Sequence, residues 1–234
     1  MTDPLTPFPT LAAEGLNLQA VFDLASLPDD VLASLALDAG ERGRYTQLLL
    51  IGHRGRQLWQ TLQARGMAGE HPIDDFSRAR ATQLFAPGGA LAGHRFRVLF
   101  PSQQPVGLRH LGELAGWHHD SPFRVGVHAN WGSWFAYRAV VVTDTALPVT
   151  PRLQTASPCD SCSDRPCVSA CPAGALAPDF DLSACLNHRK QPDSPCLDRC
   201  LARNACPVGA EHRYTEAQTS YHYLQSMPAI RKYY

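Results

Sequence analysis

The sequence predicts an α+β protein in two parts: a mixed domain over residues 1–150 and a cysteine-rich module over 151–234. Three observations support this division. Short apolar or alternating runs recur between helix-like segments up to residue 143, which is typical of strands layered with helices. All eight cysteines lie between Cys159 and Cys206. The stretch 144–158, rich in proline and threonine, has the composition of a linker.

Turn residues and hydrophobic periodicity predict the elements of the first domain in order. Expected helices begin at acidic residues or proline and end at or near glycine, whereas expected strands are short apolar or alternating runs. The sequence predicts helices at 9–15, 29–39, 56–66, 72–85 and 105–117, and strands at 16–24, 45–52, 95–100, 123–128 and 133–143. After the cysteines, a short helix at 216–225 and an aromatic tail complete the chain.

The last two expected strands form a hairpin around the turn 129–132, with one candidate ligand face. Alternation along the second strand places Trp134, Ala136 and Arg138 on one face, and His128 lies on the first strand. Aromatic, small and cationic side chains on one face suit a flat polar or anionic ligand. The alternative is that Arg138 is a surface cation and Trp134 an ordinary core residue.

The cysteine spacing indicates metal centres. The first four cysteines read C-D-S-C-S-D-R-P-C-V-S-A-C-P and the last three read C-L-D-R-C-L-A-R-N-A-C-P, so two of the eight precede proline. Clustered thiolates select zinc or iron–sulfur centres. In two-cluster ferredoxins the cysteine before proline ligates the other cluster. The sequence therefore predicts a ferredoxin-like module with two 4Fe-4S clusters, one held by Cys159, Cys162, Cys167 and Cys206, the other by Cys171, Cys185, Cys196 and Cys200.

Three other uses of the cysteines remain open. Disulfides need an oxidising compartment, which nothing in the sequence indicates. Zinc would use two pairs of thiols without any crossing between motifs. A module that keeps its thiols and binds nothing is the third.

The bulk composition restricts the class of partner and the compartment. Lysine plus arginine and aspartate plus glutamate balance at 21 each, so we expect no nucleic-acid partner. The first residues lack a basic segment followed by an apolar one, and no apolar run is long enough to cross a bilayer. We therefore expect a cytoplasmic protein without membrane contact. The predicted clusters, for their part, imply a redox partner protein that donates electrons.

Part of the chain resembles two known families. The run Trp134-Phe-Ala-Tyr-Arg138 and its surroundings from Leu108 to Val142 are similar to the cobalamin-processing type C family (methylmalonic aciduria and homocystinuria type C). The same region followed by an eight-cysteine module resembles epoxyqueuosine reductase, which joins a cobalamin-binding, nitroreductase-like domain to two 4Fe-4S clusters. The resemblance implies a nitroreductase-like first domain that holds cobalamin, a corrinoid, near His128, Trp134 and Arg138.

The sequence departs from these families at three places. Epoxyqueuosine reductases carry an aspartate proton donor where alignment on Pro105 puts Ser102, and a serine cannot donate a proton in that way near neutral pH. We expect no tRNA-binding repeats after the clusters, and the D-x-H-x-x-G pattern of a histidine-ligated corrinoid is missing from these residues. Two functions follow as hypotheses: a reductase whose clusters serve a cofactor in the first domain, or a ferredoxin-like electron carrier whose first domain docks a partner.

Overall fold

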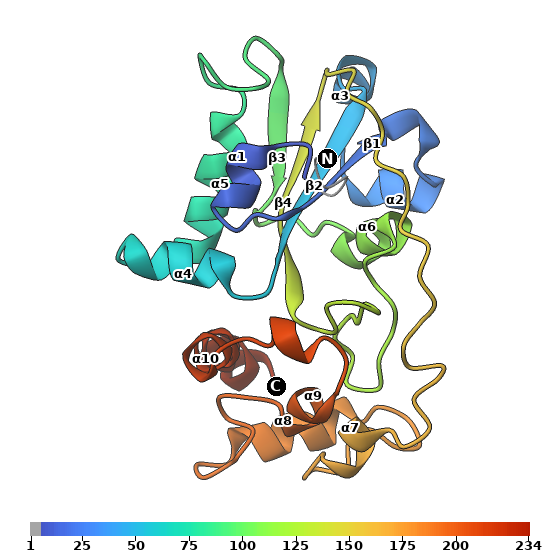
Figure 1. The fold of residues 1–234 in the computed structure, drawn as a ribbon, viewed down its shortest axis with the longest axis vertical. Coiled ribbons are helices and arrows are strands. Elements are labelled where there is room, and N and C mark those ends of the chain that lie inside the picture. The colour runs from blue at the N-terminus through green and yellow to red at the C-terminus, as the bar shows by residue number, and fades with distance from the viewer. Residues whose placement is uncertain (1–5) are drawn as a thin grey trace. The chain divides into compact units, whose positions relative to one another are not determined.

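The computed structural model describes residues 6–234, which form two compact units (Figure 1). Unit 1 contains the described residues up to Gly116 together with Phe135–Leu153, and unit 2 contains Trp117–Trp134 and Gln154–Tyr234. The predicted boundary at residue 150 lies close to the last change of unit. The segment 117–134, however, belongs to unit 2 and not to the first part of the chain as the sequence analysis expected.

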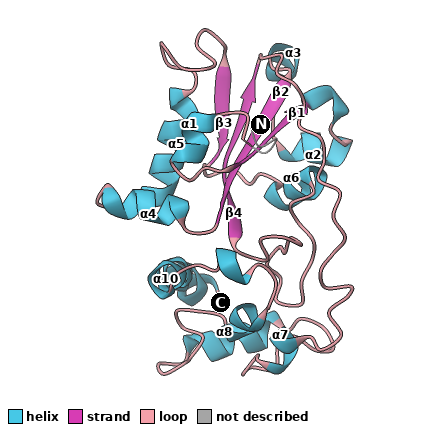
Figure 2. Ribbon diagram, in the orientation of Figure 1, coloured by secondary structure: helices cyan, strands magenta, loops and turns pink. Residues whose placement is uncertain are grey.

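Unit 1 is built on one antiparallel sheet of four strands in the order β1-β2-β4-β3 (Figure 2). Its strands are β1 (Leu18–Asp23), β2 (Gln47–Arg54), β3 (Phe96–Phe100) and β4 (Phe135–Thr143). Strand β2 is buried along nearly its whole length and β4 over its second half, from Ala139 to Thr143, which explains why these stretches read as continuous apolar runs. The antiparallel sheet agrees with the predicted α+β class.

Helices pack on this sheet and follow most of the predicted ranges. They are α1 (Pro9–Ala13), the 3-10 turn η1 (Leu24–Ser26), α2 (Asp29–Ser34), α3 (Ala39–Arg44), α4 (Gln57–Ala64), α5 (Pro72–Gln83) and α6 (Leu108–Ala115). Helix α5 packs against β3 and β4, and α4 packs against α5. Helix α6 meets β4 where Gly112 faces Tyr137, whose hydroxyl oxygen would lie 1.8 Å from any Cβ at position 112.

The helix predicted at 29–39 is wrong in its second half. Helix α2 ends at Ser34, and Ala36 has a left-handed φ of 49°, which a continuous helix cannot accommodate. A second helix then begins after Asp38. There the Asp38 side chain accepts the N–H of Glu41, and the Glu41 carboxylate accepts the N–H of Asp38, in a complete capping box.

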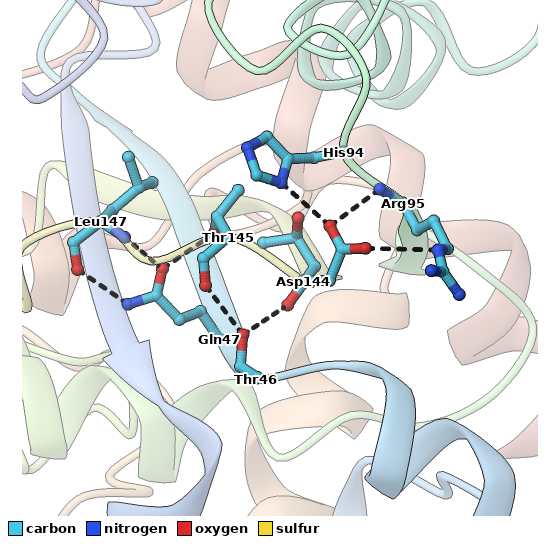
Figure 3. Close-up of polar contacts among 8 residues, drawn as sticks. Thr46, Gln47, His94, Arg95, Asp144, Thr145 and Leu147 are labelled. Atoms are coloured by element: carbon cyan, nitrogen blue, oxygen red, sulfur yellow. Dashed lines mark hydrogen bonds and ion pairs between the residues drawn. The ribbon is translucent and has the colours of Figure 1, made fainter.

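Polar contacts hold the segment after β4 against the start of β2 (Figure 3). The Gln47 side chain accepts the N–H of Leu147 and donates to its carbonyl oxygen, both at 2.8 Å. In the same segment, Asp144 accepts the N–H of Arg95, the residue before β3, at 2.9 Å and contacts His94 Nδ1 at 3.0 Å. Side-chain hydrogen bonds therefore join the segment after β4 to the starts of β2 and β3, and their role is structural.

Unit 2 consists of helices and loops without a sheet among its described residues, and all of its helices except the last are short (Figure 2). The helices are α7 (Pro166–Ser169), α8 (Leu182–Lys190), α9 (Leu201–Ala205), the 3-10 turn η2 (Ala210–His212) and α10 (Glu216–Tyr233). Helix α10 is longer than the predicted 216–225 and continues through Pro228, because Met227 and Ile230 bury their side chains with Leu186 of α8. The ferredoxin-like description of this module stays a prediction.

The strand predicted at 123–128 does not form. Arg124 has a φ of 61°, which breaks the extended backbone, and only isolated bridges join His119 to Val127 and His128 to Gly132. The expected hairpin with β4 is therefore absent, and β4 begins at Phe135 instead of Ser133. Among the described residues, no helix is both long and apolar enough to span a membrane.

Candidate metal centre

The eight cysteines gather in unit 2 as two groups of four, each lining its own cavity. None is in a disulfide. Group A lines a cavity of about 400 Å³ and comprises Cys159, Cys162, Cys167 and Cys206. Group B lines a cavity of about 240 Å³ and comprises Cys171, Cys185, Cys196 and Cys200. The structure thus brings together the same two sets that the sequence analysis expected, although neither set is continuous along the chain.

The thiols of group A act on one another electrostatically. Burial raises the pKa of Cys159, and Cys206, Cys167 and Cys162 raise it further. Burial likewise raises the pKa of Cys167, with Cys206 as the next cause. The proline-tailed Cys206 is therefore the neighbour with the largest charge effect on both thiols, despite lying far along the chain from them.

The thiols of group B also act on one another, but here a nearby cation opposes the rise in their pKa. Burial raises the pKa of Cys185, followed by the charge of Cys200, whereas the guanidinium of Arg189 lowers it. Burial also raises the pKa of Cys196, and there the N–H of Leu201 and the charge of Arg189 act in the opposite direction. A metal that replaced the protons would relieve the mutual repulsion of four thiolates in each group.

Two short helices position members of both groups. Cys167 lies in α7 and Cys171 follows it, so one turn of chain serves group A and then group B. Helix α9 does the reverse, because Cys200 caps its N-terminus and Cys206 its C-terminus. Helix α9 packs against α7. The contact between these two helices places Cys206 with the first three cysteines, and it places Cys171 with Cys185, Cys196 and Cys200.

An apolar cluster fills the space that the two groups share. Its buried residues are Phe123, Cys167, Leu176, Ala202 and Cys206, and Cys171 and Cys200 pack against them. Both groups therefore contribute thiols to one apolar surface. Apolar surroundings limit the access of water to a metal centre and tune its potential.

Two arginines contact the backbone or thiols of group B cysteines. Arg189 donates from Nε to the carbonyl oxygen of Cys196 at 3.2 Å. Arg203 donates its backbone N–H to Cys200 Sγ at 3.4 Å, while its side chain donates to the carbonyl oxygen of Ser133 at 2.6 Å. Neither arginine was predicted as a neighbour of the cysteines. For Arg203 a signal existed, because it lies three residues after Cys200, where a helix presents an N–H to its capping residue.

The other candidate ligand residues do not form one face. His128 and Trp134 are 0% exposed in unit 2. His128 stacks on Trp131 with ring centroids 3.5 Å apart, and Trp134 packs edge-on against Tyr214 at 5.4 Å. Both side chains are thus used in the packing of unit 2.

Arg138 belongs to unit 1, at a bulge in β4. Ile51 pairs with Ala139 and Gly52 with Tyr137, which leaves Arg138 as the extra residue. Its Nε donates to His53 Nδ1 at 2.9 Å. The expected alternation of Trp134, Ala136 and Arg138 along a single strand face is therefore wrong, because the strand begins after Trp134 and the bulge interrupts it at Arg138. That these residues hold a cofactor stays a prediction.

The fold is similar to that of a known group of enzymes. No protein-family model matches the sequence, and no curated protein matches it. An epoxyqueuosine reductase solved with an epoxyqueuosine-modified tRNA-Tyr stem loop aligns with a TM-score of 0.54 at 14% identity, covering 91% of this chain and 66% of that one. The enzyme from Bacillus subtilis, solved with its catalytic loop swung out of the active site, aligns with a TM-score of 0.53 at 14% identity over 89% and 65%. That from Streptococcus thermophilus gives 0.51 at 13% identity over 90% and 67%.

These similarities establish the fold alone. They confirm at that level the predicted resemblance to epoxyqueuosine reductase, and the resemblance to the cobalamin-processing type C family stays a prediction. The chain spans just under two thirds of the length of the first two of these enzymes, at 66% and 65%. The expected absence of a nucleic-acid partner also stays a prediction, and one of these enzymes was solved with a tRNA stem loop.

Proposed function

We propose that this chain is an iron–sulfur oxidoreductase in which unit 2 holds two 4Fe-4S clusters and a cofactor or substrate is bound by unit 1. The clusters supply one-electron transfer when bound. Group A and group B each hold one of them through four thiolates, and a redox partner protein provides the electrons. The protein contributes binding, orientation and shielding from water.

The grouping of the thiols carries this proposal. A disulfide module would pair its cysteines, whereas all eight are free. Two sets of four thiols, each lining one cavity beside a shared apolar cluster, provide the ligand number that a 4Fe-4S cluster requires. Zinc would also accept four thiolates, and metal analysis separates the two.

Anaerobic purification with iron and sulfide analysis is the direct test. We expect about eight irons and eight inorganic sulfides per chain, as two four-iron clusters require. A broad visible absorption that bleaches with dithionite and an electron paramagnetic resonance signal of the reduced protein should accompany them. Stoichiometric zinc without iron, or a colourless protein that cannot be reconstituted, would refute the proposal.

For the ligand of unit 1 we propose a flat cofactor of the corrinoid class. The similarity of fold to epoxyqueuosine reductase supports this, as does the Arg138–His53 pair, which places a cation and an imidazole together at the bulge of β4. Titration of the anaerobic protein with hydroxocobalamin should shift the corrinoid absorption bands. Arg138→Leu should weaken this binding, and Arg109→Leu, on the exposed surface of α6, is the matched control.

A ferredoxin-like electron carrier is the second candidate function, and one observation favours it. Ser102 lies where the resembling enzymes have their proton donor, and its hydroxyl donates to the carbonyl oxygen of Leu99 at 2.6 Å, a contact that caps a turn. A carrier would hold its full complement of iron and leave the corrinoid bands unchanged. This outcome would end the cofactor proposal for unit 1 while leaving the clusters in place.

A further inference from the structure

A histidine on the wall of the group B cavity has a buried nitrogen without a partner. His188 lines that cavity together with the four thiols of group B. Its Nε2 atom is shielded from solvent and has no hydrogen-bond partner among the residues that the structure describes. An unpaired buried polar atom destabilises a fold, so such atoms are rare and often mark a place where a bound group completes the bonding.

Helix α8 holds this imidazole beside one of the thiols. Cys185 and His188 lie three residues apart in α8, so they are neighbours on the helix surface, with Cβ atoms about 5–6 Å apart. The burial of Leu186 against Met227 and Ile230 of α10 fixes which face of α8 is turned inward. The position of the histidine next to group B is therefore set by packing and not by an exposed, freely rotating side chain.

The two arginines on the same wall already have acceptors. Arg189 donates to the carbonyl oxygens of Cys196 and Tyr223 and to Ser226 Oγ, at 3.1 to 3.2 Å. Arg199 pairs with Asp198, with Nε 2.9 Å from Oδ1. The described residues supply no such acceptor to His188, which leaves the partner of its Nε2 to a group bound in the cavity.

We propose that His188 is a positioning residue that donates a hydrogen bond from Nε2 to a sulfur atom of the cluster held by group B. The inference rests on the proposed function, because it concerns a cluster that unit 2 is proposed to bind. Thiolate and inorganic sulfide atoms carry no hydrogen and can only accept, so the imidazole tautomer with its hydrogen on Nε2 fits them. The four thiols already supply the ligands of a 4Fe-4S cluster, so His188 is not needed as a ligand.

This hydrogen bond has a consequence for the redox chemistry of group B. Hydrogen bonds to the sulfurs are among the factors that set the reduction potential of an iron–sulfur cluster. Reduction by one electron from the partner protein adds negative charge to the cluster, and a hydrogen-bond donor stabilises that charge. His188 therefore raises the potential of the group B cluster relative to the same cluster without it. The effect is confined to group B, because His188 does not line the cavity of group A.

Pulsed electron paramagnetic resonance of anaerobic, dithionite-reduced protein tests the contact directly. Protein labelled with ¹⁵N only in histidine should show a weak hyperfine coupling from the reduced cluster to a histidine nitrogen. The coupling should disappear in His188→Phe, which keeps a ring of similar size but has no donor. It should persist in the matched control His212→Phe, because His212 lines neither cavity.

A redox titration measures the effect on potential. His188→Phe should lower one of the two midpoint potentials by about 59 mV, a tenfold change in a one-electron equilibrium, and leave the other unchanged. His188→Gln retains an N–H donor and should restore part of the shift. His212→Phe should shift neither midpoint.

Two results with normal iron content would overturn the inference and leave the proposed function standing. One is the absence of a histidine coupling in the labelled wild-type protein, which is the result expected if a buried water molecule is the partner of Nε2. The other is a coupling as strong as that of an imidazole bound directly to iron. If His188→Phe loses its clusters, the labelled wild-type protein still decides between these results. A wild-type protein that lacks iron and sulfide would refute both the inference and the proposed function.

Discussion

The guanidinium of Arg203 lies 4.4 Å from the centroid of the Trp134 ring, while the backbone N–H of the same residue contacts Cys200 Sγ at 3.4 Å. One buried residue thus connects a thiol of group B to the last residue before β4. Its guanidinium also donates to Ser133 and lies 5.1 Å from the ring of Tyr214. Arg203 therefore has a structural role that can be measured.

Arg203→Met should destabilise unit 2 by about 2 kcal/mol. It leaves the carbonyl oxygen of Ser133 without its donor and removes a cation from between two aromatic rings. Urea unfolding of the anaerobic protein, followed by tryptophan fluorescence, measures this, because three of the four tryptophans lie in unit 2. The control Arg199→Met removes a partly exposed ion pair and should cost less than about 1 kcal/mol. Equal losses in both variants would contradict this role.

Paired cysteine substitutions distinguish the crossed grouping from one that follows the chain. Cys159→Ser with Cys206→Ser removes two thiols of group A, so about half of the iron should remain. Cys171→Ser with Cys200→Ser removes two thiols of group B and should also leave about half. The double variant Cys159→Ser with Cys171→Ser removes one thiol from each group and should lose nearly all of the iron. If the first four cysteines held one cluster by themselves, this last pair would instead retain half.

Tyr137 predicts a loss of stability at alkaline pH. Burial, and then the charge of Glu113, raises the pKa of Tyr137 well above its usual value of 10.0. The unfolded chain therefore releases this proton first, so stability is complete below about pH 10 and falls above it, by up to about 1.4 kcal/mol per pH unit. Tyr137→Phe should flatten this dependence in urea unfolding followed by circular dichroism. Tyr233→Phe, at an exposed position, should leave the dependence unchanged.

Gly112 and Gly43 predict opposite effects of the same substitution. At Gly112 an added Cβ would lie 1.8 Å from the hydroxyl oxygen of Tyr137, so Gly112→Ala should destabilise unit 1 by about 1–3 kcal/mol. A Cβ added at Gly43 would have no neighbouring heavy atom within 4 Å, so Gly43→Ala should stabilise α3 by up to about 1 kcal/mol. Thermal unfolding of both variants measures this, and a neutral Gly112→Ala would show that Tyr137 can move aside.

The sequence predicted the sheet well because its strands carry strong hydrophobic patterns. Strands β1 to β4 each lie within or close to a predicted range, and in β2 the apolar run Leu48–Ile51 is short and ends at a glycine, as is typical of a buried strand. The break at Ala36 could also have been found, because Asp38 and Glu41 have the spacing of a capping box. The strand at 123–128 could not, since alternation does not reveal that Arg124 adopts a left-handed conformation.

The cysteine groups could be predicted from spacing, but their surroundings could not. The proline after Cys171 and Cys206 indicated the crossing, and the structure places these thiols accordingly. The position of Arg189 depends on α10, whose Tyr223 and Ser226 accept its hydrogen bonds from more than thirty residues away. Contacts between segments so distant in the chain leave no local pattern. The burial of Trp134 likewise follows from Arg203 and Tyr214, which lie far along the chain.

The interleaving of the two thiol groups has a consequence for biosynthesis. Group B lacks its fourth thiol until Cys200 has left the ribosome, and group A until Cys206 has followed. A nascent chain that ends before Cys200 completes neither set, so iron delivered at that stage would meet an incomplete set of the proposed ligands. A nonsense codon or a proteolytic cut between Cys171 and Cys185 would separate the members of both sets at once.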